Sequence, residues 1–203
     1  MKMRVWQKYG LYGVLGWLLV VMSTPLKADD EATFWQALQE GGKVVLVRHA
    51  AIDREFGDPL TLDDSCFTER NLNAVGREQA QWIGQAFRQR QIEVRAVLAS
   101  PHCRTRDTAE IAFGGYEVAP MLRVIRALPE SQAKARLAQT RERIASFSGP
   151  GNLVMVTHRP NIGELIYHRL EPGDMAVLAP MGMEEGEPMF DLIATFSVST
   201  LNQ

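Results

Sequence analysis

The chain has 203 residues, of which 46% are hydrophobic, and its formal net charge at pH 7 is -2. This length allows one substantial hydrophobic core and is short for two complete domains. The low net charge and the lack of a long basic run argue against nucleic acid as a partner.

The first 28 residues have the layout of a secretory signal peptide. Basic residues without an acidic one precede a 12-residue apolar stretch, LYGVLGWLLVVM, and a polar break follows that ends at Ala28. The apolar stretch is short for a membrane span. We therefore expect cleavage after Ala28, export to the periplasm and no stable membrane insertion, with residues 29–203 as one domain. The alternative is an uncleaved membrane anchor.

Beyond this segment, predicted helices and strands alternate. Helices between apolar strands predict a single α/β domain with a mostly parallel sheet and helices on both faces, in three layers. The expected elements, in chain order, are a helix over 31–42, a strand over 43–47, a long polar loop over 50–71, a helix over 73–90 with Asn73 as N-cap, a strand over 93–100, a helix opened by Ser100 and Pro101 and closed by Gly114, a short strand over 116–120, a helix over 131–147, a strand over 152–157, a helix over 160–170, and strands over 173–180 and 189–199.

Basic side chains follow three of the predicted strands. Arg48 and His49 come directly after one strand, Arg104 lies in the turn after the next, and His158 follows a third. Ligands of such sheets bind beyond the carboxyl ends of the strands. Guanidinium groups match phosphate oxygens in pairs, so this edge of the sheet is predicted to bind a phosphate dianion.

Four segments carry a family resemblance. LVRHA, LNAVGREQA, SPHCRTRDTAE and VMVTHRPNI occur in this order between residues 43 and 170. In these motifs the chain resembles the histidine phosphatase superfamily, which includes phosphoglycerate mutases and acid phosphatases. Each motif follows the expected strand or opens the expected helix, which makes the resemblance specific.

The resemblance implies roles for the residues at the strand ends. His49 would attack phosphorus and become transiently phosphorylated, while Arg48, Arg104 and His158 would hold the phosphoryl oxygens. It implies no metal and no cofactor, because positioned cations already neutralise the oxygens. The alternative, a zinc site built from histidines and cysteines, lacks a closely spaced pair of ligands. Arg70 and Asn71, at the end of the polar loop, are expected to contact the substrate.

The proton donor departs from the family pattern. Val124 and Arg159 stand at the two positions where relatives carry a catalytic carboxylate, and Ala50 replaces the usual glycine after the histidine. Glu130 is the nearest possible general acid. Its place in the first turn of a predicted helix favours a structural role instead.

The two cysteines lie in the polar segments DDSCFTERNL and SPHCRTRDT. An oxidising compartment favours a disulfide between Cys66 and Cys103. Two unrelated free thiols are the alternative.

Export narrows the function that the resemblance implies. We expect a periplasmic phosphomonoesterase for a phosphorylated envelope sugar or small phosphoester, similar to exported phosphatases of the lipopolysaccharide core heptose phosphatase type. The alternatives are a phosphohistidine phosphatase and a binding protein for phosphate ligands without turnover. The sequence leaves the natural substrate and the oligomeric state open.

Overall fold

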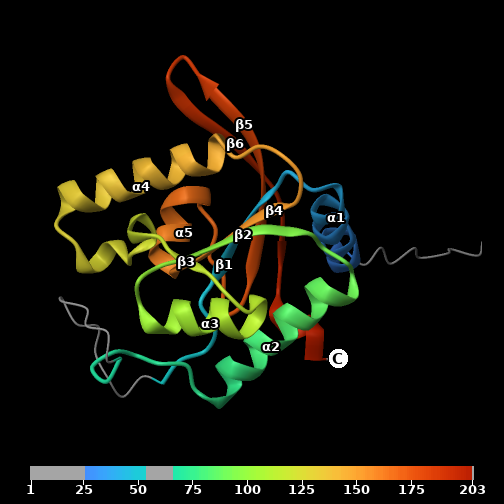
Figure 1. Ribbon diagram of the computed structural model, residues 1–203. Helices are drawn as coiled ribbons and strands as arrows, with labels where there is room; N and C mark the ends of the chain where they lie inside the picture. The colour runs from blue at the N-terminus through green and yellow to red at the C-terminus, as the bar shows by residue number, and fades with distance from the viewer. Residues whose placement is uncertain (1–25, 54–65, 203) are drawn as a thin grey trace, which may run out of the picture.

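The apolar strands of the chain assemble into a mixed sheet of six strands in the order β3-β2-β4-β1-β5-β6. The computed structural model describes residues 26–53 and 66–202 (Figure 1). The parallel strands are β1 (Val44–Arg48), β2 (Val94–Ala99), β3 (Glu117–Val118) and β4 (Asn152–Thr157), and the antiparallel pair at one edge is β5 (Met175–Glu184) and β6 (Glu187–Phe196). This arrangement confirms the predicted, mostly parallel α/β fold.

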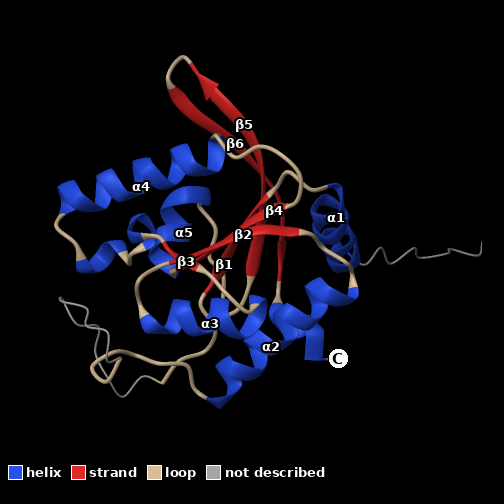
Figure 2. Cartoon of the chain, in the orientation of Figure 1, coloured by secondary structure: helices blue, strands red, loops and turns tan. Residues whose placement is uncertain are grey.

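Helices cover both faces of the sheet (Figure 2). On one face lie α1 (Leu26–Glu40), α2 (Ala74–Gln89) and α3 (Cys103–Phe113). On the other lie α4 (Glu130–Ala145) and α5 (Arg159–Ile166), with the short 3-10 helices η1 (Pro120–Leu122) and η2 (Ile125–Ala127) leading into α4; a third, η3 (Val198–Asn202), ends the described chain. The predicted three layers are therefore present.

Strand β1 shows why its sequence is continuously apolar. Val45 and Val47 pack into the core beneath α1, α2 and α3, while Val44 and Leu46 pack into the core beneath α4 and α5. Successive side chains of a strand point to opposite faces, so a strand that is covered on both faces has no polar position. The apolar run ends at Arg48, where β1 reaches the edge of the sheet formed by the carboxyl ends of the parallel strands.

Two local features differ from the expectation. Helix α3 begins at Cys103 with His102 as its N-cap, rather than at Ser100, because the Ser100 hydroxyl is engaged with another side chain. The strands β5 and β6 extend past Pro180 to a turn at Glu185 and Gly186. Both turn residues have positive φ, which suits a two-residue hairpin loop, and a register shift next to Pro180 accommodates the missing N–H.

Other boundaries agree closely with the predicted elements. Asn73 caps α2, since its Oδ1 accepts a hydrogen bond from the Gly76 N–H, and Gly114 ends α3 in the left-handed region. Helix α1 begins at Leu26, earlier than expected. Residues 54–65 of the polar loop lie outside the described residues. Among those that are described, no helix combines the length and apolar character needed to cross a membrane.

Candidate active site

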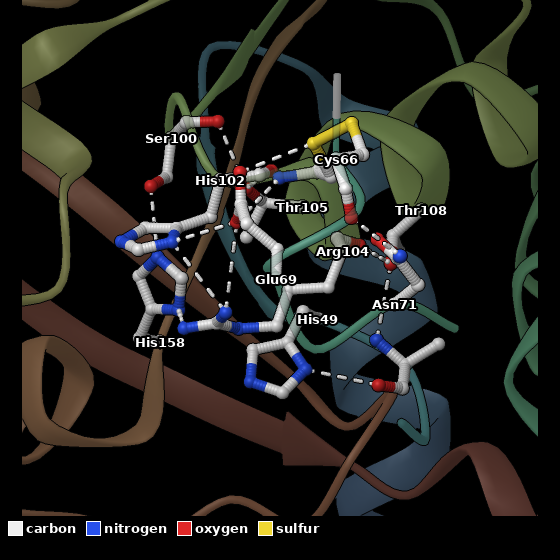
Figure 3. A network of polar contacts seen from close by, with 12 residues as sticks. His49, Cys66, Glu69, Asn71, Ser100, His102, Arg104, Thr105, Thr108 and His158 are labelled. Carbon is white, nitrogen blue, oxygen red and sulfur yellow. Dashed lines mark hydrogen bonds and ion pairs between the residues drawn. A yellow bond between two sulfur atoms is a disulfide. The ribbon is translucent and has the colours of Figure 1, made fainter. Parts of the chain in front are cut away.

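The basic side chains predicted at the strand ends converge on one cavity. Strands β1 and β4 are parallel neighbours in which Arg48 pairs with Thr157, so the residues that follow, His49 and His158, emerge side by side. Arg104, in the first turn of α3, reaches the same point (Figure 3). All four basic groups line a cavity of about 660 Å³.

The contacts of His49 leave one of its ring nitrogens unprotonated. Its Nδ1 lies 2.9 Å from the backbone oxygen of Ala50. A carbonyl oxygen can only accept a hydrogen bond, so Nδ1 carries the proton and Nε2 keeps its lone pair. Burial, reinforced by the charge of Arg104, lowers the pKa of His49 to about 3, which outweighs the opposing effect of the bond to Ala50. His49 is therefore neutral at pH 7, the form that can attack phosphorus.

His158 is held in a defined tautomer by its two neighbours. Arg104 Nη2 lies 3.3 Å from His158 Nδ1, and because a guanidinium only donates, this nitrogen accepts. The other ring nitrogen, Nε2, then carries the proton and donates to Ser100 Oγ at 2.8 Å. Burial, together with the charge of Arg104, lowers the pKa of His158 well below its usual value. Ser100 thus orients His158, a role that the sequence did not indicate.

Arg48 is fixed by the loop that follows α5. Its Nη1 donates to the backbone oxygen of Leu170 at 2.7 Å and lies 3.4 Å from Glu171 Oε2. These contacts hold the guanidinium at the wall of the cavity beside His49.

A buried carboxylate, Glu69, contacts both Arg104 and the start of α3. Its Oε2 accepts from the Cys103 N–H at 3.1 Å, lies 3.0 Å from His102 Nδ1 and lies 4.0 Å from Arg104 Nη1 (Figure 3). The carboxylate has no exposed surface. Because Cys103 is the first residue of α3, Glu69 caps this helix and places a negative charge beside Arg104.

The disulfide explains how Glu69 comes to this position. Cys66 and Cys103 are bonded, with their Cα atoms 5.9 Å apart. This pairing was predicted, and it ties the segment that carries Glu69 to the start of α3. Since both sulfur atoms are in the disulfide, neither cysteine offers the thiolate that the zinc alternative would need.

Residues 44–130 match the family model of the histidine phosphatase superfamily (branch 1). This part of the chain is similar to that superfamily. The match covers β1, α2, β2, α3 and the approach to α4, and so includes His49 and Arg104. No curated protein matches the chain.

Solved structures of several phosphatases have a similar fold. The protein histidine phosphatase SixA, solved with tungstate, superposes with a TM-score of 0.55 at 16% identity over 78% of this chain and 99% of SixA. A putative alpha-ribazole-5'-P phosphatase from Escherichia coli K-12 gives 0.53 at 16% identity, covering 77% of this chain and 98% of its own. A mycobacterial glucosyl-3-phosphoglycerate phosphatase gives 0.51 at 15%, covering 75% and 97%. At these identities the similarity concerns the fold.

The structure separates the other two predicted substrate contacts, Arg70 and Asn71. Arg70 lines the cavity. Asn71, predicted to contact the substrate, is not among the residues that line it; its Nδ2 donates instead to the backbone oxygen of Cys66 at 2.9 Å and so orders the loop.

The two positions expected for a proton donor hold one apolar and one basic residue. Val124 and Arg159 both line the cavity, whereas Glu130 does not. The Glu130 side chain is 82% exposed in the first turn of α4 and pairs with Lys134 at 2.6 Å, which agrees with a structural role. None of the described residues that line the cavity carries a carboxylate.

Proposed function

We propose that the protein is a periplasmic phosphomonoesterase that hydrolyses a phosphorylated envelope sugar or another small phosphoester. The proposal rests above all on His49, a buried, neutral imidazole in the wall of a basic cavity, whose Nδ1 proton is held by Ala50. A strand end that is covered on both sheet faces supplies the rigid support that a nucleophile requires.

The reaction takes two displacements at phosphorus. His49 Nε2 attacks, a P–N bond forms and the bond from phosphorus to the ester oxygen breaks, with the electron pair leaving on that oxygen, which takes a proton from water or from the substrate. Water then attacks the phosphohistidine, the P–N bond breaks and inorganic phosphate leaves. Arg48 and Arg104 stabilise the charge that spreads over the nonbridging oxygens.

The periplasmic location is supported by two features. The first 28 residues have the composition of a signal peptide, and the only two cysteines of the chain form a disulfide. Disulfides persist in oxidising compartments and are rare in the cytosol.

The direct test replaces the nucleophile. His49→Ala should abolish hydrolysis of p-nitrophenyl phosphate, while His168→Ala, a change at an exposed histidine outside the cavity, should retain the wild-type rate. Rapid quenching of the wild type with labelled substrate should trap an acid-labile, base-stable phosphoprotein. Retention of most of the rate by His49→Ala would exclude the mechanism.

A phosphohistidine phosphatase is the second candidate, and it is favoured by one observation. With Val124 at the position of the usual acid, no described residue of the cavity wall can protonate a poor leaving group. The imidazole of phosphohistidine leaves more easily than an alkoxide and depends less on an acid. Export argues against this substrate, and comparison of kcat/KM for a phosphohistidine peptide and a sugar phosphate separates the two candidates.

A further prediction holds for both candidate activities, because no carboxylate is found among the described residues of the cavity wall. The rate should depend steeply on the pKa of the leaving group, with aryl phosphates reacting far faster than alkyl phosphates of similar size. Glu130→Gln should leave this slope unchanged, because Glu130 lies outside the cavity wall. A shallow slope in the wild type that becomes steep in Glu130→Gln would identify Glu130 as the acid after all.

A further inference from the structure

The cavity is more basic than one phosphoryl group requires. Six arginines line it, and no acidic residue of the described chain does; they are Arg48, Arg70, Arg104, Arg126, Arg159 and Arg169. A phosphate monoester carries about two negative charges at neutral pH. Even with neutral histidines, the wall holds several positive charges beyond those that the reacting group can balance.

Three of these arginines form a separate group on the α5 side. Arg126 comes from η2, Arg159 is the first residue of α5, and Arg169 lies in the segment after α5. The same three line an adjoining hollow of about 490 Å³, whose wall includes neither His49 nor Arg104. They therefore stand at the boundary between the reaction site and this second space.

Ion pairs compensate only part of the charge of this group, and Glu164 is the one acidic residue among the described residues that line the hollow. Within residues 26–53 and 66–202, Arg169 pairs with Glu171 at 3.2 Å, while neither Arg126 nor Arg159 has an ion pair. Glu171 also faces Arg48 at 3.4 Å, so one carboxylate is shared between two guanidiniums.

The positive potential reaches the reaction site. Burial is the main cause that lowers the pKa of Arg48, and the charges of Arg159 and Arg169 lower it further, against the opposing charge of Glu171. Like charges that line one cavity repel one another, and an anion bound between them offsets this repulsion.

We propose that Arg126, Arg159 and Arg169 form a second anion subsite, and that the substrate is a phosphomonoester with a further phosphate or carboxylate group. This inference rests on the proposed function for the group that is cleaved at His49. Arg126, Arg159 and Arg169 line both the cavity that contains His158 and the adjoining hollow, so one substrate can span the two spaces. Planar guanidinium forks suit either anion, because both present paired oxygens.

The experiment compares substrates that differ by one anionic group. Phosphate release is measured from glucose 1,6-bisphosphate, 6-phosphogluconate and glucose 6-phosphate. The wild type should show a kcat/KM for the bisphosphate that is at least about tenfold that for glucose 6-phosphate, beyond the factor of about two expected from its two phosphates. A preference for 6-phosphogluconate instead would identify the second group as a carboxylate.

The arginine variants test where this preference arises. Arg126→Gln with Arg159→Gln should reduce the ratio between bisphosphate and monophosphate toward about two, because the second group loses two of its three partners. The matched control, Arg136→Gln, changes an arginine on α4 that lines neither space and should keep the wild-type ratio. An unchanged ratio in the double variant, or equal loss in the control, would overturn the subsite.

A binding measurement distinguishes failure of the subsite from failure of the enzyme. Calorimetry with His49→Ala, which cannot turn over, should show tighter binding of the bisphosphate than of glucose 6-phosphate. If the wild type hydrolyses p-nitrophenyl phosphate but neither turnover nor binding favours a second anionic group, the subsite is wrong and the phosphatase stands. If the wild type hydrolyses no phosphoester while this binding preference depends on Arg126 and Arg159, the subsite stands and the proposed function is wrong.

Discussion

Glu69→Gln should destabilise the protein and disturb the site at once. The change keeps the shape of the side chain but removes its charge, next to the Cys103 N–H at 3.1 Å, His102 Nδ1 at 3.0 Å and Arg104 Nη1 at 4.0 Å. Loss of an N-cap typically costs about 1 kcal/mol, and removal of one partner of a buried ion pair costs about 3–5 kcal/mol. Since the amide oxygen of glutamine can still accept one bond, we expect the free energy of unfolding to fall by about 2–4 kcal/mol.

The assay is equilibrium unfolding in urea at pH 7 with the disulfide intact. Glu78→Gln, on the exposed face of α2, is the matched control and should change the free energy of unfolding by less than about 0.5 kcal/mol. A double-mutant cycle of Glu69→Gln with Arg104→Leu should show coupling above about 1 kcal/mol, because the two side chains share one buried site. A loss for Glu69→Gln no larger than that of the control would refute the role assigned to this carboxylate.

Three further predictions concern the same site. Arg104→Ala should lower kcat at least about 100-fold, because this donor meets charge that grows in the transition state; a loss confined to KM would contradict it. Because the pKa of His49 in the folded protein is about 3 and lies below its ordinary value of 6.5, the unfolded chain binds more protons between these pH values. Neutral His49 thus makes its full contribution to the free energy of unfolding above pH 6.5. This contribution falls by about 1.4 kcal/mol per pH unit as the pH is lowered toward 3. Urea unfolding at several pH values should show a shallower loss in His49→Gln, and an equal slope would contradict the burial argument. Reduction of the Cys66–Cys103 disulfide, which closes a span of 37 residues, should lower the free energy of unfolding by about 4 kcal/mol in the chain-entropy model; unfolding with and without dithiothreitol measures this, and an unchanged midpoint would contradict it.

The sequence by itself determined the framework and which basic groups lie together at one edge of the sheet. Apolar runs such as Val44–Val47 require a strand that is buried on both faces, and the helical periodicity between them requires covering layers. Both signals are local, since they depend on spacing within one segment. The ends of parallel strands meet at one edge, so His49, Arg104 and His158 could be assigned to a common site before any contact was known.

Only the tertiary structure decided which other side chains complete that site. Glu69 reaches Cys103 across 34 positions, and Ser100 reaches His158 across 58. Neither pair has a periodic signal, because a polar residue in a loop looks the same in sequence whether it is solvated or buried against a charge.

Tertiary packing also decides where Glu130 and Arg159 lie. Glu130 and Arg159 both stand at the start of a helix, yet the packing of η2 and α5 turns Arg159 into the cavity wall and leaves Glu130 exposed. Local sequence fixes that each residue begins a helix. Which helix start faces the cavity depends on how the layers pack over the sheet, and contacts among the apolar residues of all the layers together set that packing.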